Sequence, residues 1–137
     1  MRDITVNILH CADTRTDQSF SISDVRKWHL ARGWSDVGYH YYIRLNGVLE
    51  KGRDLDRVGS HAYGFNKGSI GTCFEGGKNP DGSKWSEPTA KQIETFVILN
   101  KYLNEKLDTV LDVRGHYEFS KKTCPNFDIC VLEDYLK

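Results

Sequence analysis

The sequence has 137 residues, of which 39% are hydrophobic, and it carries 19 basic and 19 acidic side chains, so its formal net charge is zero. A chain of this length is about one domain long and can bury roughly two-thirds of its unfolded surface. A neutral net charge gives no electrostatic case for nucleic acid or a membrane surface, and no apolar run approaches the ~20 residues of a membrane span. We therefore expect one domain, residues 1–137, without membrane insertion.

Periodicity and turn signals predict eight elements in chain order: a strand at 4–9, a helix at 21–33, strands at 37–44, 48–51 and 69–74, a helix from 89 to about 106, a strand at 110–113 and a last helix from about 128. Capping boxes at Ser21 and Thr89 mark the starts of two helices. Asn46-Gly47 predicts a hairpin in which both turn positions need positive φ. This order predicts an α/β fold with a central mixed sheet flanked by helices.

Two segments carry less regular signals. Residues 52–67 have no clear period and hold several glycines, so they predict a surface loop that carries His61. In the last helix, three side chains are expected to pack against the core: Val131, Leu132 and Tyr135. Cys130, in the same helix, is expected to be a buried thiol.

A histidine lies at the end of one predicted strand and another follows a second strand. His10 ends the strand at 4–9, and His116 follows the strand at 110–113. If these strands are neighbours, both rings and Cys124 converge at one end of the sheet. Nitrogen and sulfur are the ligands that zinc prefers, and three protein ligands with an open position are typical of catalytic zinc. Spacing alone leaves the alternative that the three residues are unrelated.

Two further side chains fit the chemistry of a zinc hydrolase. Lys122 lies two residues before Cys124 and would supply positive charge to a developing oxyanion, and Tyr39 would offer a hydroxyl. A solvated loop lysine and a packing tyrosine are the alternatives. The residues themselves therefore favour a zinc hydrolase and do not identify its substrate.

The first residues do not have the pattern of a secretory signal. Residues 1–7 include acidic and polar side chains where a signal peptide needs an apolar core. We therefore expect synthesis in a reducing cytosol, where the four cysteines are thiols or ligands rather than disulfides. A site of action beyond a membrane must then be reached by another route.

Five motifs in a fixed order resemble those of one family, and together they cover essentially the whole chain: Leu9-His10-Cys11, residues 33–40, 50–62, 66–71 and 122–128. The family is the type 2 group of zinc-dependent N-acetylmuramoyl-L-alanine amidases, which includes phage T7-type lysozymes and peptidoglycan recognition proteins. The resemblance implies hydrolysis of the amide bond between the lactyl group of muramic acid and L-alanine in peptidoglycan.

The resemblance also assigns roles to particular residues. It implies a Zn²⁺ ion held by His10, His116 and Cys124. It implies catalytic roles for Tyr39 and Lys122. It also implies that His61 and Asn66 line the cleft and bind substrate. We expect a monomer. A phage enzyme without a signal peptide is expected to be made in the host cytoplasm and to reach peptidoglycan after the membrane is permeabilised.

Two alternatives belong to other functional classes. A non-catalytic peptidoglycan-binding module is one, but such relatives commonly lack the cysteine ligand, so Cys124 favours an enzyme. The other is an amidase that also binds and inhibits a phage RNA polymerase, as the resemblance to the T7-type enzyme implies. The sequence begins almost directly on its first predicted strand, which leaves little arm for such a partner to hold.

Overall fold

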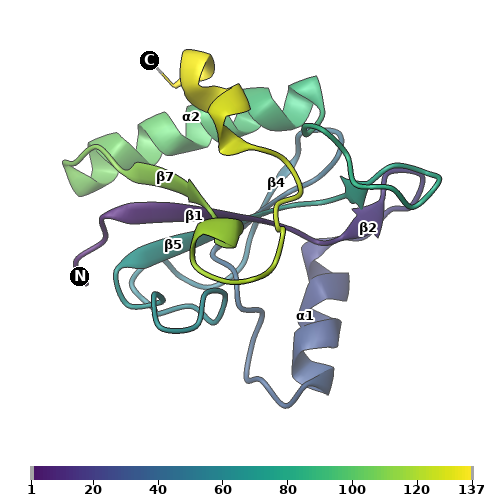
Figure 1. Cartoon of the computed structure of the whole chain (residues 1–137). Coiled ribbons are helices and arrows are strands. Elements are labelled where there is room, and N and C mark those ends of the chain that lie inside the picture. Colours follow the sequence, from purple (N-terminus) through teal and green to yellow (C-terminus); the bar gives the residue numbers. More distant parts are fainter. Residues whose placement is uncertain (1, 137) are drawn as a thin grey trace.

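The computed structural model describes residues 2–136 and has a five-stranded sheet at its centre, with strand order β4-β3-β5-β1-β7 (Figure 1). The strands β5, β1 and β7 are parallel neighbours, β3 joins β5 in parallel, and β4 is antiparallel to β3. The bounds are β1 (Val6–Cys11), β3 (Tyr41–Ile43), β4 (Leu49–Lys51), β5 (Ser69–Phe74) and β7 (Asp112–Gly115). The expected α/β class with a mixed central sheet is confirmed.

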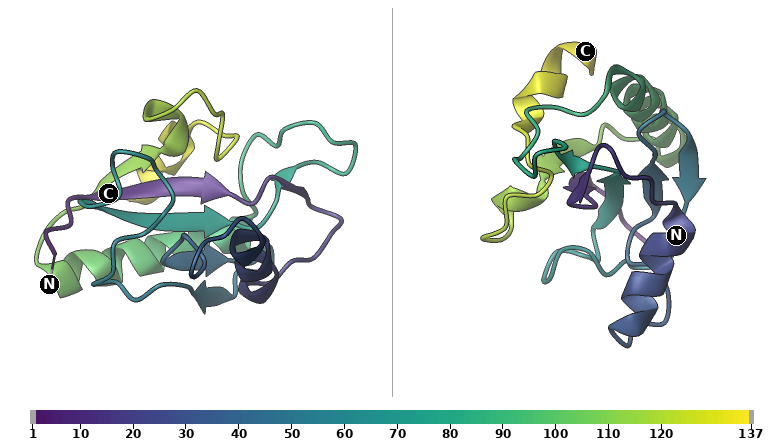
Figure 2. Two further views of the ribbon diagram at one scale, coloured as in Figure 1. Left: turned by 90° about the horizontal axis from the view of Figure 1, so that it is seen from below. Right: turned by 90° about the vertical axis from the view of Figure 1, so that its right-hand side faces the viewer.

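Two helices cover opposite faces of this sheet (Figures 1 and 2): α1 (Ile22–Ala31) and α2 (Ala90–Leu107). Side chains alternate between the faces of a strand, and neighbours on β3 accordingly join different clusters. Tyr42 packs with Val25 of α1, whereas Ile43 packs with Phe96 of α2. One amphipathic helix therefore packs against each face of the sheet.

Both predicted capping boxes are present. The Ser21 hydroxyl accepts from the Asp24 N–H, and the Asp24 carboxylate accepts from the Ser21 N–H at 2.8 Å. Thr89 and Gln92 make the same reciprocal pair at the start of α2. Two of the N–H groups that a helix start leaves unpaired are satisfied each time, which fixes where each helix begins.

The predicted hairpin joins β3 to β4, but its turn differs from the prediction. Gly47 has φ of +88°, while Asn46 is not among the described residues with positive φ. The N–H of Gly47 donates to the Arg44 carbonyl at 2.8 Å, and the Arg44 N–H donates to the Val48 carbonyl at the same distance. A turn closed by a single left-handed glycine is the three-residue type of hairpin loop, so only one position needs positive φ.

The prediction for the last helix is wrong in its type and its packing. In place of an α-helix, the C-terminal segment forms a 3₁₀ helix, η2 (Ile129–Tyr135). Another 3₁₀ helix, η1 (His116–Glu118), lies directly after β7. Leu132 is fully buried, but Val131 and Tyr135 are 37% and 57% exposed, and Cys130 is exposed too. Ile129, three residues before Leu132, packs against the same core cluster, as the 3₁₀ repeat favours, but Leu136 rather than Tyr135 follows them into it.

Two short strands were not predicted. β2 (Thr14–Arg15) and β6 (Gly77–Lys78) pair in parallel as a separate two-stranded sheet beyond the ends of β1 and β5. Two-residue strands lack a detectable period, which is why the sequence predicted loops there. Within residues 2–136, no helix combines the length and apolar character that crossing a membrane requires.

Candidate metal centre

The register of β1 with β7 places two histidines side by side. Leu9 lies opposite Gly115 in this parallel pair, so the residues that follow them, His10 within β1 and His116 at the start of η1, lie at the same end of the sheet. Their ring centroids are 4.4 Å apart, and the residues are 1% and 8% exposed. The two strands are neighbours, which meets the condition under which the histidines converge, and strand pairing brings together two residues that are far apart in the sequence.

A thiol completes the cluster from the loop after η1. The Sγ of Cys124 accepts a hydrogen bond from the backbone N–H of Cys11 at 2.9 Å, and the Cys124 carbonyl accepts from the Tyr117 N–H at the same distance. The ligand atoms of His10, His116 and Cys124 all lie within 4.8 Å of one another. This is the only group of metal-ligating side chains of its kind found within residues 2–136.

The protonation states of the cluster suit a cation. Hydrogen bonding from Cys11, supported by His10 and His116, lowers the pKa of the Cys124 thiol to about 3. The same contact, together with burial, raises the pKa of Cys11, so Cys124 is the thiol that ionises. Burial lowers the pKa of His10, which keeps its ring neutral. Metal ligands must be thiolates and neutral imidazoles, and two nitrogens with one sulfur fit Zn²⁺.

Tyr39 and Lys122 both reach the same cleft. The Tyr39 ring lies 5.0 Å from the ring of His10, and burial raises the pKa of its hydroxyl well above the ordinary value. Lys122 is exposed on the loop before Cys124 and forms no ion pair with the other described residues. The site therefore offers a protonated hydroxyl and an unpaired ammonium group beside the cluster.

The cleft has a volume of about 580 Å³ and is open to solvent above the cluster. Several residues of its wall were not predicted, and they come from the loop after β1, the end of α1 and the residues after it, the loop between β4 and β5, and the segment near Cys124: Asp13, His29, Arg32, Trp34, Ser60 and Asn126. The Arg32 guanidinium carbon lies 5.8 Å from the centre of the Trp34 ring. The only sequence signal for Arg32 and Trp34 was their position, since Arg32 lies directly before the motif at 33–40 and Trp34 lies within it.

The two predicted substrate-binding residues have different positions. His61 lies in the wall of the cleft, and its Nδ1 is 2.9 Å from the Nε2 of His10. Asn66 is not among the residues that line this cleft. Its Oδ1 instead accepts hydrogen bonds from the N–H groups of His61 and Ala62, at 3.0 and 2.9 Å. The structure thus brings His61 to the metal cluster and places Asn66 behind it.

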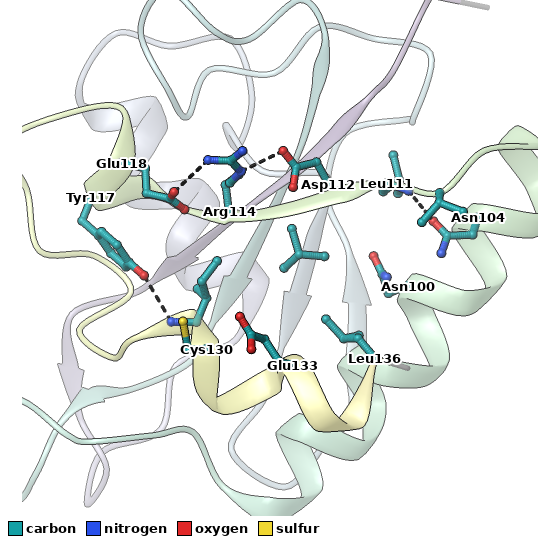
Figure 3. Close-up of a pocket in the computed structure, with 13 residues that line it drawn as sticks. Asn100, Asn104, Leu111, Asp112, Arg114, Tyr117, Glu118, Cys130, Glu133 and Leu136 are labelled. Atoms are coloured by element: carbon teal, nitrogen blue, oxygen red, sulfur yellow. Dashed lines mark hydrogen bonds and ion pairs between the residues drawn. The ribbon is translucent and has the colours of Figure 1, made fainter.

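A second cavity, of about 590 Å³, lies between α2, β7 and η2 and is a different kind of site (Figure 3). Arg114 forms ion pairs there with Asp112 at 2.7 Å and Glu118 at 3.0 Å, so its charge is neutralised (Figure 3). Hydrogen bonding to Asp128 raises the pKa of the Cys130 thiol on its wall to about 11. Its arginine is paired and its thiol is protonated, so this cavity does not resemble the group of metal ligands at the end of β1 and β7.

Comparison with known proteins agrees with this geometry. The family model described as N-acetylmuramoyl-L-alanine amidase matches residues 1–127. The endolysin of Escherichia phage T7 is 39% identical over 121 residues, which cover 88% of this chain and 80% of that protein. Peptidoglycan-recognition protein SC1a of Drosophila melanogaster is 30% identical over 119 residues, covering 85% of this chain and 62% of that protein.

A solved structure shows the same fold along almost the whole chain. The endolysin N-acetylmuramoyl-L-alanine amidase LysCS from Clostridium intestinale URNW superposes with a TM-score of 0.84 at 28% identity. The match covers 98% of this chain and 84% of that one. The resemblance predicted from the five motifs is confirmed, and this chain belongs to the type 2 N-acetylmuramoyl-L-alanine amidase family, with phage endolysins and peptidoglycan recognition proteins among its relatives.

Proposed function

We propose that this protein is a zinc-dependent endolysin that hydrolyses the amide bond between the lactyl group of muramic acid and L-alanine in peptidoglycan. One observation carries the proposal: the ligand atoms of His10, His116 and Cys124 lie within 4.8 Å of one another at an open cleft. Relatives named endolysin and peptidoglycan-recognition protein support peptidoglycan as the substrate.

These three residues would hold the cation. Two neutral imidazoles and one thiolate would leave a net charge of about +1 on the zinc group, because the thiolate cancels one of its two charges. A zinc ion bound there supplies Lewis acidity, which polarises an amide carbonyl and makes a water molecule more acidic. The chain's own side chains then orient the substrate and stabilise charge as the amide bond breaks.

Lys122 and Tyr39 are the side chains proposed for that task. The ammonium group of Lys122 is free of ion pairs with described residues, so it can donate a hydrogen bond to the carbonyl oxygen as negative charge develops. Burial keeps the Tyr39 hydroxyl protonated, so it can donate a hydrogen bond that orients the carbonyl or the attacking water. Tyr39 packs against the buried cluster under α1, so its hydroxyl is positioned before reaction, which lowers the cost of reorganisation.

The charge around the cleft supports an anionic ligand. Arg32, Lys121 and Lys122 all line it. The carboxylate of Asp13, which also lines the cleft, lies 3.6 Å from the Lys78 ammonium and accepts a hydrogen bond from Asn126. Peptidoglycan stem peptides carry free carboxylates, so a cleft with unpaired cations suits them.

Peptidoglycan digestion by the purified protein, with and without prior zinc removal, tests the proposal by mass spectrometry of the products. We expect stem peptides that begin with L-alanine, lost with a chelator and restored by zinc. Intact glycan-peptide products in every condition would favour a binding module, which would also tolerate Cys124→Ser. Cleaved sugar strands would contradict an amidase altogether.

The proposal includes a cellular route and an assembly state. We propose that residues 1–137 act as one catalytic domain and as a monomer, made in the host cytoplasm and admitted to the wall once the membrane is permeabilised. Size-exclusion chromatography with light scattering checks the monomer. Binding to a phage RNA polymerase stays a prediction from the resemblance alone, and a pull-down with the polymerase of the cognate phage checks it.

A further inference from the structure

One ring nitrogen of His10 is occupied by another histidine. Its Nε2 lies 2.9 Å from the Nδ1 of His61, and the two rings meet edge to face, with centroids 5.0 Å apart and an interplanar angle of 87°. This contact leaves Nδ1 as the nitrogen that His10 offers to the cluster with His116 and Cys124. The tautomer of His10, meaning which of its ring nitrogens carries the proton, therefore depends on which of the two histidines donates the shared hydrogen bond.

A chain of hydrogen bonds decides that question. The Ser69 hydroxyl donates to the Phe65 carbonyl at 2.7 Å, so its oxygen is available to accept from the His61 Nε2, which lies 3.2 Å away. A neutral imidazole carries a single proton, and this arrangement places it on the Nε2 of His61. The Nδ1 of His61 is then an acceptor, and His10 donates through its own Nε2–H.

We propose that His61 is a positioning residue that fixes His10 in the Nε2–H tautomer and orients its Nδ1 lone pair toward the metal. This inference rests on the zinc site proposed above and gives His61 a role other than contact with substrate. Both ring nitrogens of His61 are engaged, with His10 and Ser69, so neither is free to bind a stem peptide. Histidine ligands of metals generally donate their second N–H to such a partner.

The surroundings of His61 are shaped to hold its ring in place. A Cβ added at Gly71 would lie 2.6 Å from the His61 Cγ, and one at Gly59 would lie 2.7 Å from its Cδ2. Two glycines therefore leave the space that the ring fills. Asn66 fixes the backbone of the same loop through the N–H groups of His61 and Ala62.

The electrostatics agree with an acceptor role. Burial lowers the pKa of His61 well below its ordinary value, and the neighbouring rings of His10 and His40 act in the same direction. A neutral ring keeps the lone pair that accepts from His10. A protonated His61 would instead present a second donor to the Nε2–H of His10 and break the contact.

Zinc affinity of two variants tests the proposal by competition with a chelator. His61→Ala removes the acceptor and should weaken zinc binding by roughly 10–100-fold. In His61→Asn the side-chain oxygen takes the place of Nδ1, so we expect affinity within about threefold of the wild type. Thermal melting of the metal-free variants is the control for folding. Wild-type affinity in His61→Ala, or equal weakening in both variants, would overturn the proposal.

A measurement on the unaltered protein does not depend on whether the variants fold. Long-range ¹H–¹⁵N correlation spectra of the imidazole rings near neutral pH should show the proton on Nε2 in both His10 and His61. A proton on the Nδ1 of His10 would overturn the proposal in either the metal-free or the zinc-loaded protein. Failure of the wild-type protein to bind zinc would contradict the metal centre instead, and the metal-free spectra still report the tautomers.

Discussion

The backbone N–H of Cys11 donates a hydrogen bond to the Sγ of Cys124 across 113 positions of the sequence, at 2.9 Å. This single contact joins the end of β1 to the loop that follows η1. The site is thus assembled from backbone donors as well as side chains. Its thiol is the natural starting point for testing the metal centre.

Cys124→Ser should greatly weaken zinc binding and amidase activity while the fold is retained. A serine hydroxyl does not ionise near neutral pH, so the cluster loses its one anionic ligand. We expect zinc affinity and activity to fall by on the order of a hundredfold or more, beyond the loss typical of outer-shell changes. Zinc content and peptidoglycan digestion measure the change. Cys130→Ser, at an exposed thiol, is the control and should retain both.

Lys122→Ala should reduce turnover and leave zinc bound. Removing one donor to a developing oxyanion typically costs on the order of 10²–10³ in rate. Steady-state kinetics on muramyl peptides, with zinc content measured in parallel, separate the two effects. Lys101→Ala, at an exposed lysine of α2, serves as the matched control. Full turnover by a zinc-loaded Lys122→Ala protein would refute the role given to this lysine.

Arg32→Ala should weaken substrate binding more than it slows the chemical step. Arg32 lies in the cleft wall beside Trp34 and makes no ion pair with the other residues in the described range. A hydrogen bond to a charged partner contributes about 1.5–3 kcal/mol, so KM should rise about tenfold or more with little change in kcat. Amidating the stem-peptide carboxylates should produce the same rise in the wild type and none in the variant. Unchanged KM in the variant would contradict carboxylate binding.

Stability should fall as the solution is acidified, in part because of His40. Burial, with Arg2 and Arg53 nearby, lowers the pKa of His40 from 6.5 to about 4. Its Nδ1 accepts from the Gly71 N–H at 3.0 Å, which only a neutral ring oriented this way can do. Above pH 6.5 both folded and unfolded forms are neutral at this ring, so its contribution is fully present.

Between pH 6.5 and about 4 the unfolded chain binds a proton that the folded protein excludes, so the free energy of unfolding decreases as pH falls. The loss from this ring is about 3 kcal/mol, from the 1.36 kcal/mol that each pKa unit represents. Urea denaturation across this range measures the effect. His40→Asn, whose side-chain oxygen can accept from Gly71, should flatten the dependence by nearly one proton, and an unaltered slope would exclude His40 as its source.

Phe96→Ala should strongly destabilise the fold without touching the cleft. Phe96 is fully buried on α2, and its ring centroid lies 5.8 Å from that of Phe74 on β5. Truncating a buried phenylalanine costs about 3–5 kcal/mol, since transfer free energy is lost and a cavity remains. Ile98→Ala, at a residue of the same helix that is 63% exposed, should change stability little. Comparable losses in both variants would contradict core packing as the source, since alanine is a better helix former than either residue that it replaces.

Features set by neighbouring residues were predictable from the sequence. The capping boxes at Ser21 and Thr89 were identified because the two partners of each box are three residues apart, and both boxes form. The hairpin at Asn46-Gly47 was also found, although its turn type was not, since several loop lengths accept the same pair. The two-residue strands β2 and β6 were not predicted because they contain too few residues to show a period.

The sequence by itself determined the residue types of the centre and, through five ordered motifs, the family to which the chain belongs. Only the tertiary structure decided which of those residues meet. The pairing of β1 with β7 brings His10 to His116, and a loop hydrogen bond brings Cys124 to both. The contact between His10 and His61 joins residues 51 positions apart, and no local pattern encodes it. Sheet register and loop closure set such distances, and both depend on the packing of the whole chain.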